Sequence, residues 1–433
     1  MAILTNPITL SVIVMVVLCL CKLNVILSLL VAAFVAGLSG GLGVGDIMGF
    51  ILEGFNGNAE NALAYLLLGT FAAALAHIGL TDMLGKKIAS SVKGNKNLLL
   101  ATFVIIAIIS GTIIPVHIAY IPILIPPLLI MMNEMKMDRR QAACVTEFGL
   151  CGPYITIPIG YGLIFQGIIA DNMTSNGWAT DVKQVVPGTI ILFGGMLAGL
   201  IGSWWFYRKP REYKNIPIAG TEITAEDTKI TKNHIVAFVA IAALLAGQLK
   251  FSMPVGAICG LLVMFLGGAI PVRGSDNTIS EGIKLMGMIS FIMLIAGGYA
   301  NVVRNTGAVE KLIDAAMAIL GNSRPAFVFV LILIGLLITM GIGTSFGTIP
   351  VIAILYVPMC QRMGLSMNAT ICLIACAAAL GDAGSPASDS TLGPTAGLNA
   401  DGQHDHIWDT CVPTFLFYDI PLFIAGLIGG LVL

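Results

Sequence analysis

Long apolar segments, separated by short polar turns, follow one another along the whole chain. They lie at residues 8–21, 25–38, 61–80, 98–114, 185–207, 235–247, 255–270 and 411–433. The longer ones approach the ~20 residues that an α-helix needs to cross a bilayer. By that arithmetic the pattern predicts an all-α polytopic membrane protein with about 10–12 transmembrane or half-spanning helices.

Polar breaks that contain glycine or proline interrupt this apolar pattern in both halves of the chain. They cover residues 110–115 and 147–153 in the first half, and residues 341–350 and 381–391 in the second. Each backbone group that a break frees costs roughly several kcal/mol in hydrocarbon unless a neighbour, water or ligand satisfies it. Such breaks at matching places in two halves are the best sequence indication of a transporter's binding site.

The two halves match each other at an offset of 228 residues (307 minus 79, for example). The matching pairs are Gly79 and Gly307, Pro122 and Pro350, Cys144 and Cys372, and Pro158 and Pro386. The match predicts two inverted transport repeats, at residues 61–207 and 284–433. Residues 1–60 and 234–283 then supply further transmembrane helices, and residues 208–233 form a polar cytoplasmic linker.

Composition agrees with a membrane location. The chain is 57% hydrophobic and 10% charged, with a mean hydropathy of +0.94, whereas charged residues make up about a quarter of a soluble protein. The net charge of −1 argues against a nucleic-acid partner. The first apolar segment lacks a signal-peptide pattern and is expected to remain as a helix. Basic loops at residues 86–96 and 136–140 are expected in the cytoplasm, so the chain is predicted to be a multi-pass protein of the bacterial inner membrane.

Hydroxyls and free amides at two predicted hairpin tips suit a substrate carboxylate, because helix N-termini carry a partial positive charge. The candidate substrate-binding residues there are Ser110, Gly111, Thr112, Thr344, Ser345, Gly347 and Thr348. Close helix packing through small residues is the structural alternative for the second tip.

The break at residues 381–391 offers oxygen ligands of the kind that a hard cation such as Na⁺ prefers. Ion coupling is assigned to Gly381, Asp382 and Asp389, substrate or ammonium contacts to Ser385 and Ser388, and a possible Na⁺ site to Thr344, Asp382, Ser385 and Asp389. No lysine or arginine follows Arg362, whereas six aspartates do. A mobile cation is therefore the expected partner of Asp382 and Asp389. A structural salt bridge, or a loop outside the bilayer, is the alternative.

Several other polar residues have two interpretations. Glu147 either takes part in ion coupling or lies near the interface behind a basic loop. His117 either contacts substrate or relays protons, or is a neutral histidine bonded to a backbone carbonyl. His404 and His406 flank Asp405 without a third and fourth metal ligand, so a hydrated loop is expected there. Cysteines within apolar runs are expected to pack as small hydrophobes.

The pattern GDxxSPxSDST at residues 381–391, preceded by GTSFGT at residues 343–348, resembles the paired signatures of the NhaC-type Na⁺/H⁺ antiporter family in the ion transporter superfamily. The resemblance extends from about residue 61 to the C-terminus. The chain resembles still more closely the YuiF-like branch of that family, for which transport of an amino acid such as histidine has been suggested. Ala383 and Gly384 depart from the antiporter pattern, in which bulkier or polar residues are usual. The resemblance implies a re-entrant hairpin and a broken helix in each half, a central site and a homodimer.

These observations predict an ion-coupled secondary active transporter that works by alternating access. Its coupling ion is Na⁺ or H⁺, and its substrate is a small amino acid, with histidine as the leading candidate. One alternative is an antiporter that exchanges Na⁺ and H⁺ without an organic substrate, and another is a membrane-embedded receptor or enzyme. The sequence contains no nucleophile-and-base arrangement, phosphate loop or nucleotide motif, so neither an enzyme nor a resident cofactor is expected.

Overall fold

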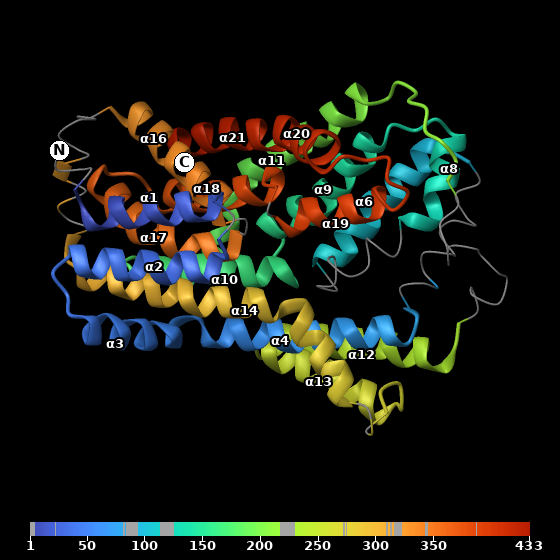
Figure 1. Cartoon of the computed structure of the whole chain (residues 1–433), viewed down its shortest axis with the longest axis horizontal. Coiled ribbons are helices and arrows are strands. Elements are labelled where there is room, and N and C mark those ends of the chain that lie inside the picture. Colours follow the sequence, from blue (N-terminus) through green and yellow to red (C-terminus); the bar gives the residue numbers. More distant parts are fainter. Residues whose placement is uncertain are drawn as a thin grey trace.

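The computed structural model describes residues 5–21, 23–80, 83, 94–112, 125–216, 230–271, 273, 275–308, 311, 314–315, 323–342, 345–386 and 388–433. Every regular element in these ranges is a helix. Many of the helices lie side by side along the long axis, with the N-terminus and α16 at the left end and α8 at the right (Figure 1). The predicted all-α fold is confirmed.

The N-terminal and connecting helices include the long helix α14. They are α1 (Pro7–Leu20), α2 (Val25–Ser39), α3 (Val44–Gly54), the short turn η1 (Phe55–Asn58), α4 (Ala59–His77), α12 (Lys232–Lys250), α13 (Met253–Leu266) and α14 (Ser275–Asn305). Of these, α2, α3, η1 and α4 pack against α14, whereas α1 packs on α2, α13 on α4, and α12 on α13. Glycine permits this packing: a Cβ on Gly54 would lie 2.5 Å from the carbonyl oxygen of Gly297, and one on Gly69 would lie 2.5 Å from that of Gly282. Small residues let membrane helices approach in this way.

Two further groups of helices carry the predicted site. The first comprises α6 (Lys96–Thr112), η2 (Pro126–Leu128), α8 (Leu129–Glu134), α9 (Arg139–Thr156), α10 (Tyr161–Ser175) and α11 (Val182–Phe206). The second comprises α16 (Arg324–Ile342), α17 (Ser345–Arg362), α18 (Met367–Gly384), α19 (Asp389–Leu398), η4 (His406–Cys411), α20 (Val412–Thr414), η5 (Phe415–Asp419) and α21 (Ile420–Val432).

Helix boundaries in these two groups recur at the offset seen in the sequence. Helices α9 and α18 differ by 228 residues at both ends (367 minus 139, and 384 minus 156), and α6 and α16 differ by 228 at their starts (324 minus 96). The helix crossings recur as well. Gly149 lies against Ala107, and Gly335 lies against Ala377, so closely that a Cβ on either glycine would overlap the alanine Cβ. The duplication is therefore present in the helix order and in the packing.

Helix α11 shows that the two halves are inverted relative to each other. It has 25 residues and is therefore about 37 Å long. Near its start, Gly188 packs against Ile371 in the first turns of α18. Near its end, the Trp204 carbonyl accepts a hydrogen bond of 2.7 Å from Gln141 in the first turn of α9. Helices α9 and α18 thus begin at opposite ends of α11, as inverted repeats require.

The second half contains both predicted interruptions. Arg324 at the start of α16 donates a 3.2 Å hydrogen bond to the carbonyl of Gly364, just past the end of α17, so the two helices form a hairpin. Helix α18 is separated from α19 by a break at residues 385–388. In the first half, α9 and α10 form a pair bent by 46°. The hairpin predicted there extends beyond α6 into residues outside the described ranges.

Several helices in the described ranges are suited to a bilayer. Helices α11 and α18, and the continuous helical segment His406–Val432, are long and apolar enough to cross it, and the bent pair α9–α10 is a fourth candidate. Six shorter apolar helices of 10–17 residues accompany them. A multi-pass membrane protein is consistent with this set, and the total of about 10–12 membrane helices stays a prediction.

Candidate functional site

A buried carboxylate, Asp382, lies near the C-terminal end of α18, just before the break. Its oxygens accept hydrogen bonds from Tyr154 Oη (2.7 Å), from the Ser345 amide (3.3 Å), from Ser388 Oγ (3.3 Å) and from Ser345 Oγ. Three separate elements, α9, α17 and the break, therefore supply donors to one side chain. Asp382 is 9% exposed. Within the described ranges, no salt bridge involves it.

The bond between Tyr154 and Asp382 joins equivalent positions of the two repeats. The residues are 228 positions apart, which is the repeat offset. Residues related by a pseudo-twofold axis touch each other only where they lie close to that axis. Asp382 is therefore at the centre of the inverted repeats, which is where substrate and ion sites of such transporters lie.

Hydroxyl groups in and after the break satisfy the backbone that the break frees. Ser388 Oγ accepts a 3.2 Å bond from the Ser390 amide and so caps α19. Ser390 Oγ donates to the Asp382 carbonyl (2.5 Å), and Thr391 Oγ1 donates to the Ser385 carbonyl (2.6 Å). The serine and threonine residues of this sequence thus stabilise an interrupted helix within an apolar surrounding.

Aromatic rings cover the tip of the α16–α17 hairpin, where Ser345 begins α17. The Phe346 ring lies 5.9 Å from that of Tyr154, 5.7 Å from that of Tyr161 and 5.6 Å from that of Tyr65, measured between ring centroids. Ser345 and Thr348 are fully buried, and Gly347 is buried beside them. The tip is therefore enclosed, with the hydroxyl and amide of Ser345 turned toward Asp382.

A second buried acid, Glu147, lies on α9 two turns before Tyr154. It is fully buried inside the protein, so its carboxyl group faces neither solvent nor lipid. Glu147 Oε1 accepts a 2.8 Å hydrogen bond from Cys151 Sγ, whereas Oε2 has no partner among the described residues. In the same ranges, no group of three or more His, Cys, Asp or Glu side chains is arranged to hold a metal ion.

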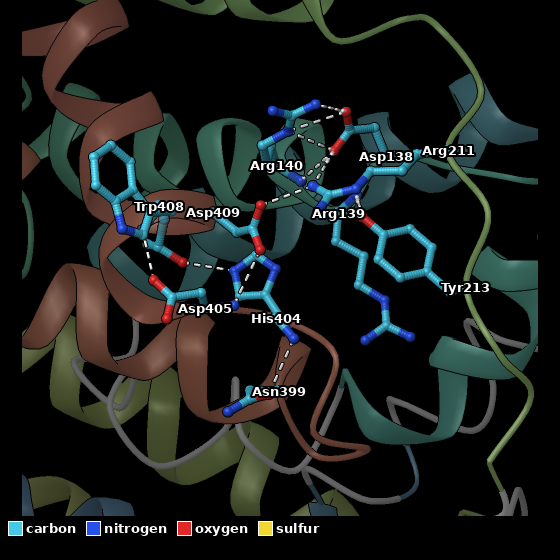
Figure 2. Close-up of polar contacts among 11 residues, drawn as sticks. Asp138, Arg139, Arg140, Arg211, Tyr213, Asn399, His404, Asp405, Trp408 and Asp409 are labelled. Carbon is cyan, nitrogen blue, oxygen red and sulfur yellow. Dashed lines mark hydrogen bonds and ion pairs between the residues drawn. The ribbon is translucent and has the colours of Figure 1, made fainter.

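A second polar cluster joins the start of α9 to the loop between α19 and η4. It comprises Asp138, Arg139, Arg140, Arg211, Tyr213, Asn399, Asp401, His404, Asp405 and Asp409, and Figure 2 shows most of it. Arg139 Nη1 and Nη2 each donate a 2.6 Å bond to the Asp401 carboxylate, and both side chains are buried. Burial alone would raise the pKa of Asp401, but the bonds from Arg139 and Gln403 hold it below its ordinary value.

One expectation about the acidic C-terminal region is wrong, and the charge argument made for Asp382 and Asp389 does not extend to its other acids. Asp401 and Asp409 do have basic partners, because Arg139 and Arg211 of the first half reach them across the fold; Arg211 Nη1 lies 2.7 Å from Asp409 Oδ1. His404 does not lie in a hydrated loop: it is 2% exposed, and its Nε2 lies 2.7 Å from Thr410 Oγ1.

The free energy of unfolding is expected to decrease as the pH is lowered below about 6.5, because of His404. Burial lowers the pKa of its imidazole from 6.5 to about 4. Between these values the unfolded chain binds the proton and the folded chain does not, so the stabilisation is present above pH 6.5 and is lost as the pH falls. The loss should reach roughly 1–3 kcal/mol. The melting temperature of His404→Gln, measured between pH 4.5 and 7.5, should therefore change less with pH than that of the unmodified protein. Equal pH slopes would contradict this assignment.

The structure brings together only some of the predicted site residues. Ser345 and Ser388 both contact Asp382 directly. Gly381, the residue before Asp382, packs against Thr339 of α16. Ser385 and Thr348 are buried in the same region. His117 and Thr344 lie outside the described residues. Ser110, Gly111 and Thr112 end α6 and Asp389 begins α19, but the side chains at these positions are not among those described.

Sequence reasoning missed two residues of this region. Tyr154 occupies the position equivalent to Asp382, so subtracting the repeat offset from each candidate acid of the second half would have found it. Asp419 lies in the last apolar segment and is 2% exposed. An acid inside an apolar segment is itself a signal of function in a membrane protein.

Comparison with known proteins agrees with this architecture. Residues 145–427 match the family described as the Na⁺/H⁺ antiporter family, and residues 6–92 match a second one described as the Na⁺-H⁺ antiporter family. The chain is 46% identical over 99% of its length to a Bacillus subtilis (strain 168) protein named "Putative amino acid transporter YuiF", of which it covers 100%. It is 46% identical to an uncharacterized membrane protein of Vibrio parahaemolyticus, with the same coverage of both chains.

Solved structures show a similar fold. The Alcanivorax borkumensis YdaH transporter superposes with a TM-score of 0.60 at 12% identity, covering 87% of this chain and 86% of that one. MtrF of Neisseria gonorrhoeae, described as one of a class of antimetabolite efflux pumps, gives a TM-score of 0.60 at 17% identity, with 98% and 94% covered. The buried acid at the centre of two inverted repeats, the family matches and the relatives agree: this chain is an ion-coupled membrane transporter that belongs to the Na⁺/H⁺ antiporter family.

Proposed function

We propose that this protein couples the movement of a small amino acid to that of Na⁺ or H⁺. The observation that carries the proposal is the position of Asp382, where hydroxyl groups from both repeats converge on one buried carboxylate without a fixed cation among the described residues. A buried carboxylate that lacks a permanent partner costs several kcal/mol, by order of magnitude, when it is ionised. A mobile cation supplies the missing charge.

The groups around Asp382 can rearrange to hold such a cation. The hydroxyls of Tyr154, Ser345 and Ser388 are donors in the present arrangement, but each also carries lone pairs that can face an ion. Oxygen-only coordination of this kind suits a hard cation such as Na⁺. Binding the ion offsets the charge of Asp382 and favours the state that also holds substrate.

An amino acid fits the polar groups beside the ion. The start of α17 at Ser345 is a helix N-terminus, and helix N-termini attract carboxylates. The predicted partner tip is the end of α6, at residues 110–112. Ser388, Ser385 and Asp382 would then face the ammonium group. The printed name of the Bacillus subtilis relative supports this substrate class. Histidine is the first candidate within it.

Alternating access follows from the same contacts. The bonds from Tyr154 and Ser345 to Asp382 connect the broken helix of one repeat to the hairpin and broken helix of the other. Movement of one group of helices against the other changes these bonds and the ion site together. A homodimer, implied by the family resemblance, is part of the same proposal.

Uptake into proteoliposomes tests the function. Labelled histidine should accumulate when a Na⁺ gradient or a pH gradient is imposed, and counter-flow against a panel of other amino acids should define the substrate. Empty liposomes are the control. A pH-dye response to added Na⁺ without uptake of any amino acid would instead establish the Na⁺/H⁺ antiporter without an organic substrate, the function that the family description favours.

A further inference from the structure

Asp419 is a buried acid that the site at Asp382 does not use. It lies inside the apolar helical segment His406–Val432 and is 2% exposed. Neither of its carboxylate oxygens has a hydrogen-bond partner among the described residues. Buried polar groups are almost always hydrogen-bonded, so an unpartnered carboxyl at this depth requires an explanation.

The local helix geometry holds Asp419 against the break in α18. Asp419 ends η5 (Phe415–Asp419), a π-helical turn, and such turns occur frequently at functional sites. A Cβ on Gly384 would overlap Asp419 Oδ2 and would lie 3.0 Å from the Phe415 Cα. Glycine at 384 therefore lets the acid pack directly on the backbone two residues beyond Asp382.

The described groups that face Asp419 are acidic or neutral. Asp419 packs on Gly384, two residues beyond Asp382. Its neighbour Tyr418 donates a 2.5 Å hydrogen bond to the Cys144 carbonyl of α9, one turn before Glu147. Both acids act on Asp419 electrostatically. Helix α11 also packs against η5, but its sole charged residue, Lys183, lies near its opposite end. Among the described residues these three carboxyl groups have no neighbouring base, and they are too costly to be ionised together. At least one of them must hold a proton or a cation.

The chemistry around each acid indicates which one holds a proton. Asp382 is surrounded by hydroxyl oxygens, which a metal cation needs as further ligands. Asp419 has no such oxygens bonded to it in the described structure, and Glu147 has the Cys151 thiol and one hydroxyl, that of Ser390, beside it. A proton needs only one carboxylate oxygen, whereas Na⁺ needs several ligands.

We infer that Asp419, together with Glu147, forms a proton-binding site separate from the cation site at Asp382. The inference rests on the proposed ion-coupled function. Protonation converts one carboxylate to a neutral carboxylic acid, and release of that proton restores the charge that favours a cation at Asp382. A proton at Asp419 or Glu147 therefore weakens Na⁺ binding at Asp382, and Na⁺ at Asp382 weakens proton binding at the other two acids.

Two measurements test this inference: infrared spectroscopy of the purified protein and uptake of labelled histidine into proteoliposomes. Both are made on the full chain and on its variants Asp419→Asn and Glu147→Gln. The carbonyl stretch of a protonated carboxylic acid should be present in the unmodified protein and should titrate with pH. It should lose intensity in Asp419→Asn. Histidine uptake driven by a pH gradient should fall about tenfold or more in the same variant, since a lost interaction of about 1.4 kcal/mol is a factor of ten. Uptake driven by a Na⁺ gradient should fall less.

Full pH-driven uptake in Asp419→Asn, or an unchanged carboxylic-acid band in both variants, would overturn the inference. If Asp419→Asn cannot be purified folded, Glu147→Gln decides by the same two measurements. If the unmodified protein transports no histidine, the proposed substrate fails, but the infrared titration still decides whether Asp419 holds a proton. Asp46→Asn, an exposed acid in the first turn of α3, is the matched control and should behave as the unmodified protein.

Discussion

Replacing Asp382 with asparagine is expected to abolish ion-coupled uptake while leaving the protein folded. Asparagine has the shape of aspartate, and its Oδ1 can still accept bonds from the Ser345 amide and from Ser388. Its Nδ2 can donate to Tyr154 and to Ser345 Oγ, because a hydroxyl accepts as well as donates. The substitution therefore removes the charge and keeps the hydrogen bonds. A cation at this site would lose its contact with a charged ligand. An interaction with a charged group contributes about 1.5–3 kcal/mol, so uptake should fall by roughly 10-fold to more than 100-fold.

The measurement is initial uptake of labelled substrate in proteoliposomes, with the melting temperature of the purified variant measured alongside. The melting temperature should stay within about 3 °C of that of the unmodified protein. Asp46→Asn serves as the control for loss of one carboxylate elsewhere. Retention of ion-driven accumulation in Asp382→Asn would exclude Asp382 from the coupling site, and the proposed mechanism with it.

Local sequence signals predicted the parts of this architecture that depend on local physics. Apolar segments indicate helices, and glycine and proline mark the places where helices break, because both effects act within a few residues. The break at residues 385–388 and the hairpin tip at Ser345 were predicted on these grounds. The repeat offset was visible as well, because each repeat needs its small residues at the same helix crossing, as at Gly149 and Gly335.

Partners from distant parts of the chain were not predictable in the same way. The absence of basic residues after Arg362 suggested that the C-terminal acids have no fixed partners, yet Arg139 bonds Asp401 across 262 residues of sequence. Asp382 and Asp419 lack such a partner among the described residues, whereas Asp401 and Asp409 have one. Composition cannot separate these two classes, because only the folded helix packing decides which acid a given arginine reaches.

Removing the Arg139 side chain is expected to destabilise the protein by about 3–5 kcal/mol, because it would leave the buried Asp401 carboxylate without its cation. Arg139 is fully buried, and Nη1 also donates to the Leu398 carbonyl (2.8 Å) and Nη2 to Asn133 Oδ1 (2.9 Å). Arg139→Ala should lower the melting temperature in detergent by roughly 5–15 °C. Asp401→Ala alone should also destabilise the protein, since it leaves the Arg139 guanidinium buried without its carboxylate partner.

The double variant Arg139→Met with Asp401→Leu separates charge pairing from packing. Replacing a buried ion pair by apolar residues of similar volume is often neutral or stabilising, so the double variant should recover most of the lost stability. Its transport then reports on whether this contact, which joins the start of the broken helix α9 to the loop after α19, has a role beyond holding the two repeats together. A melting temperature of Arg139→Ala equal to that of the unmodified protein would show that the pair contributes nothing to the fold.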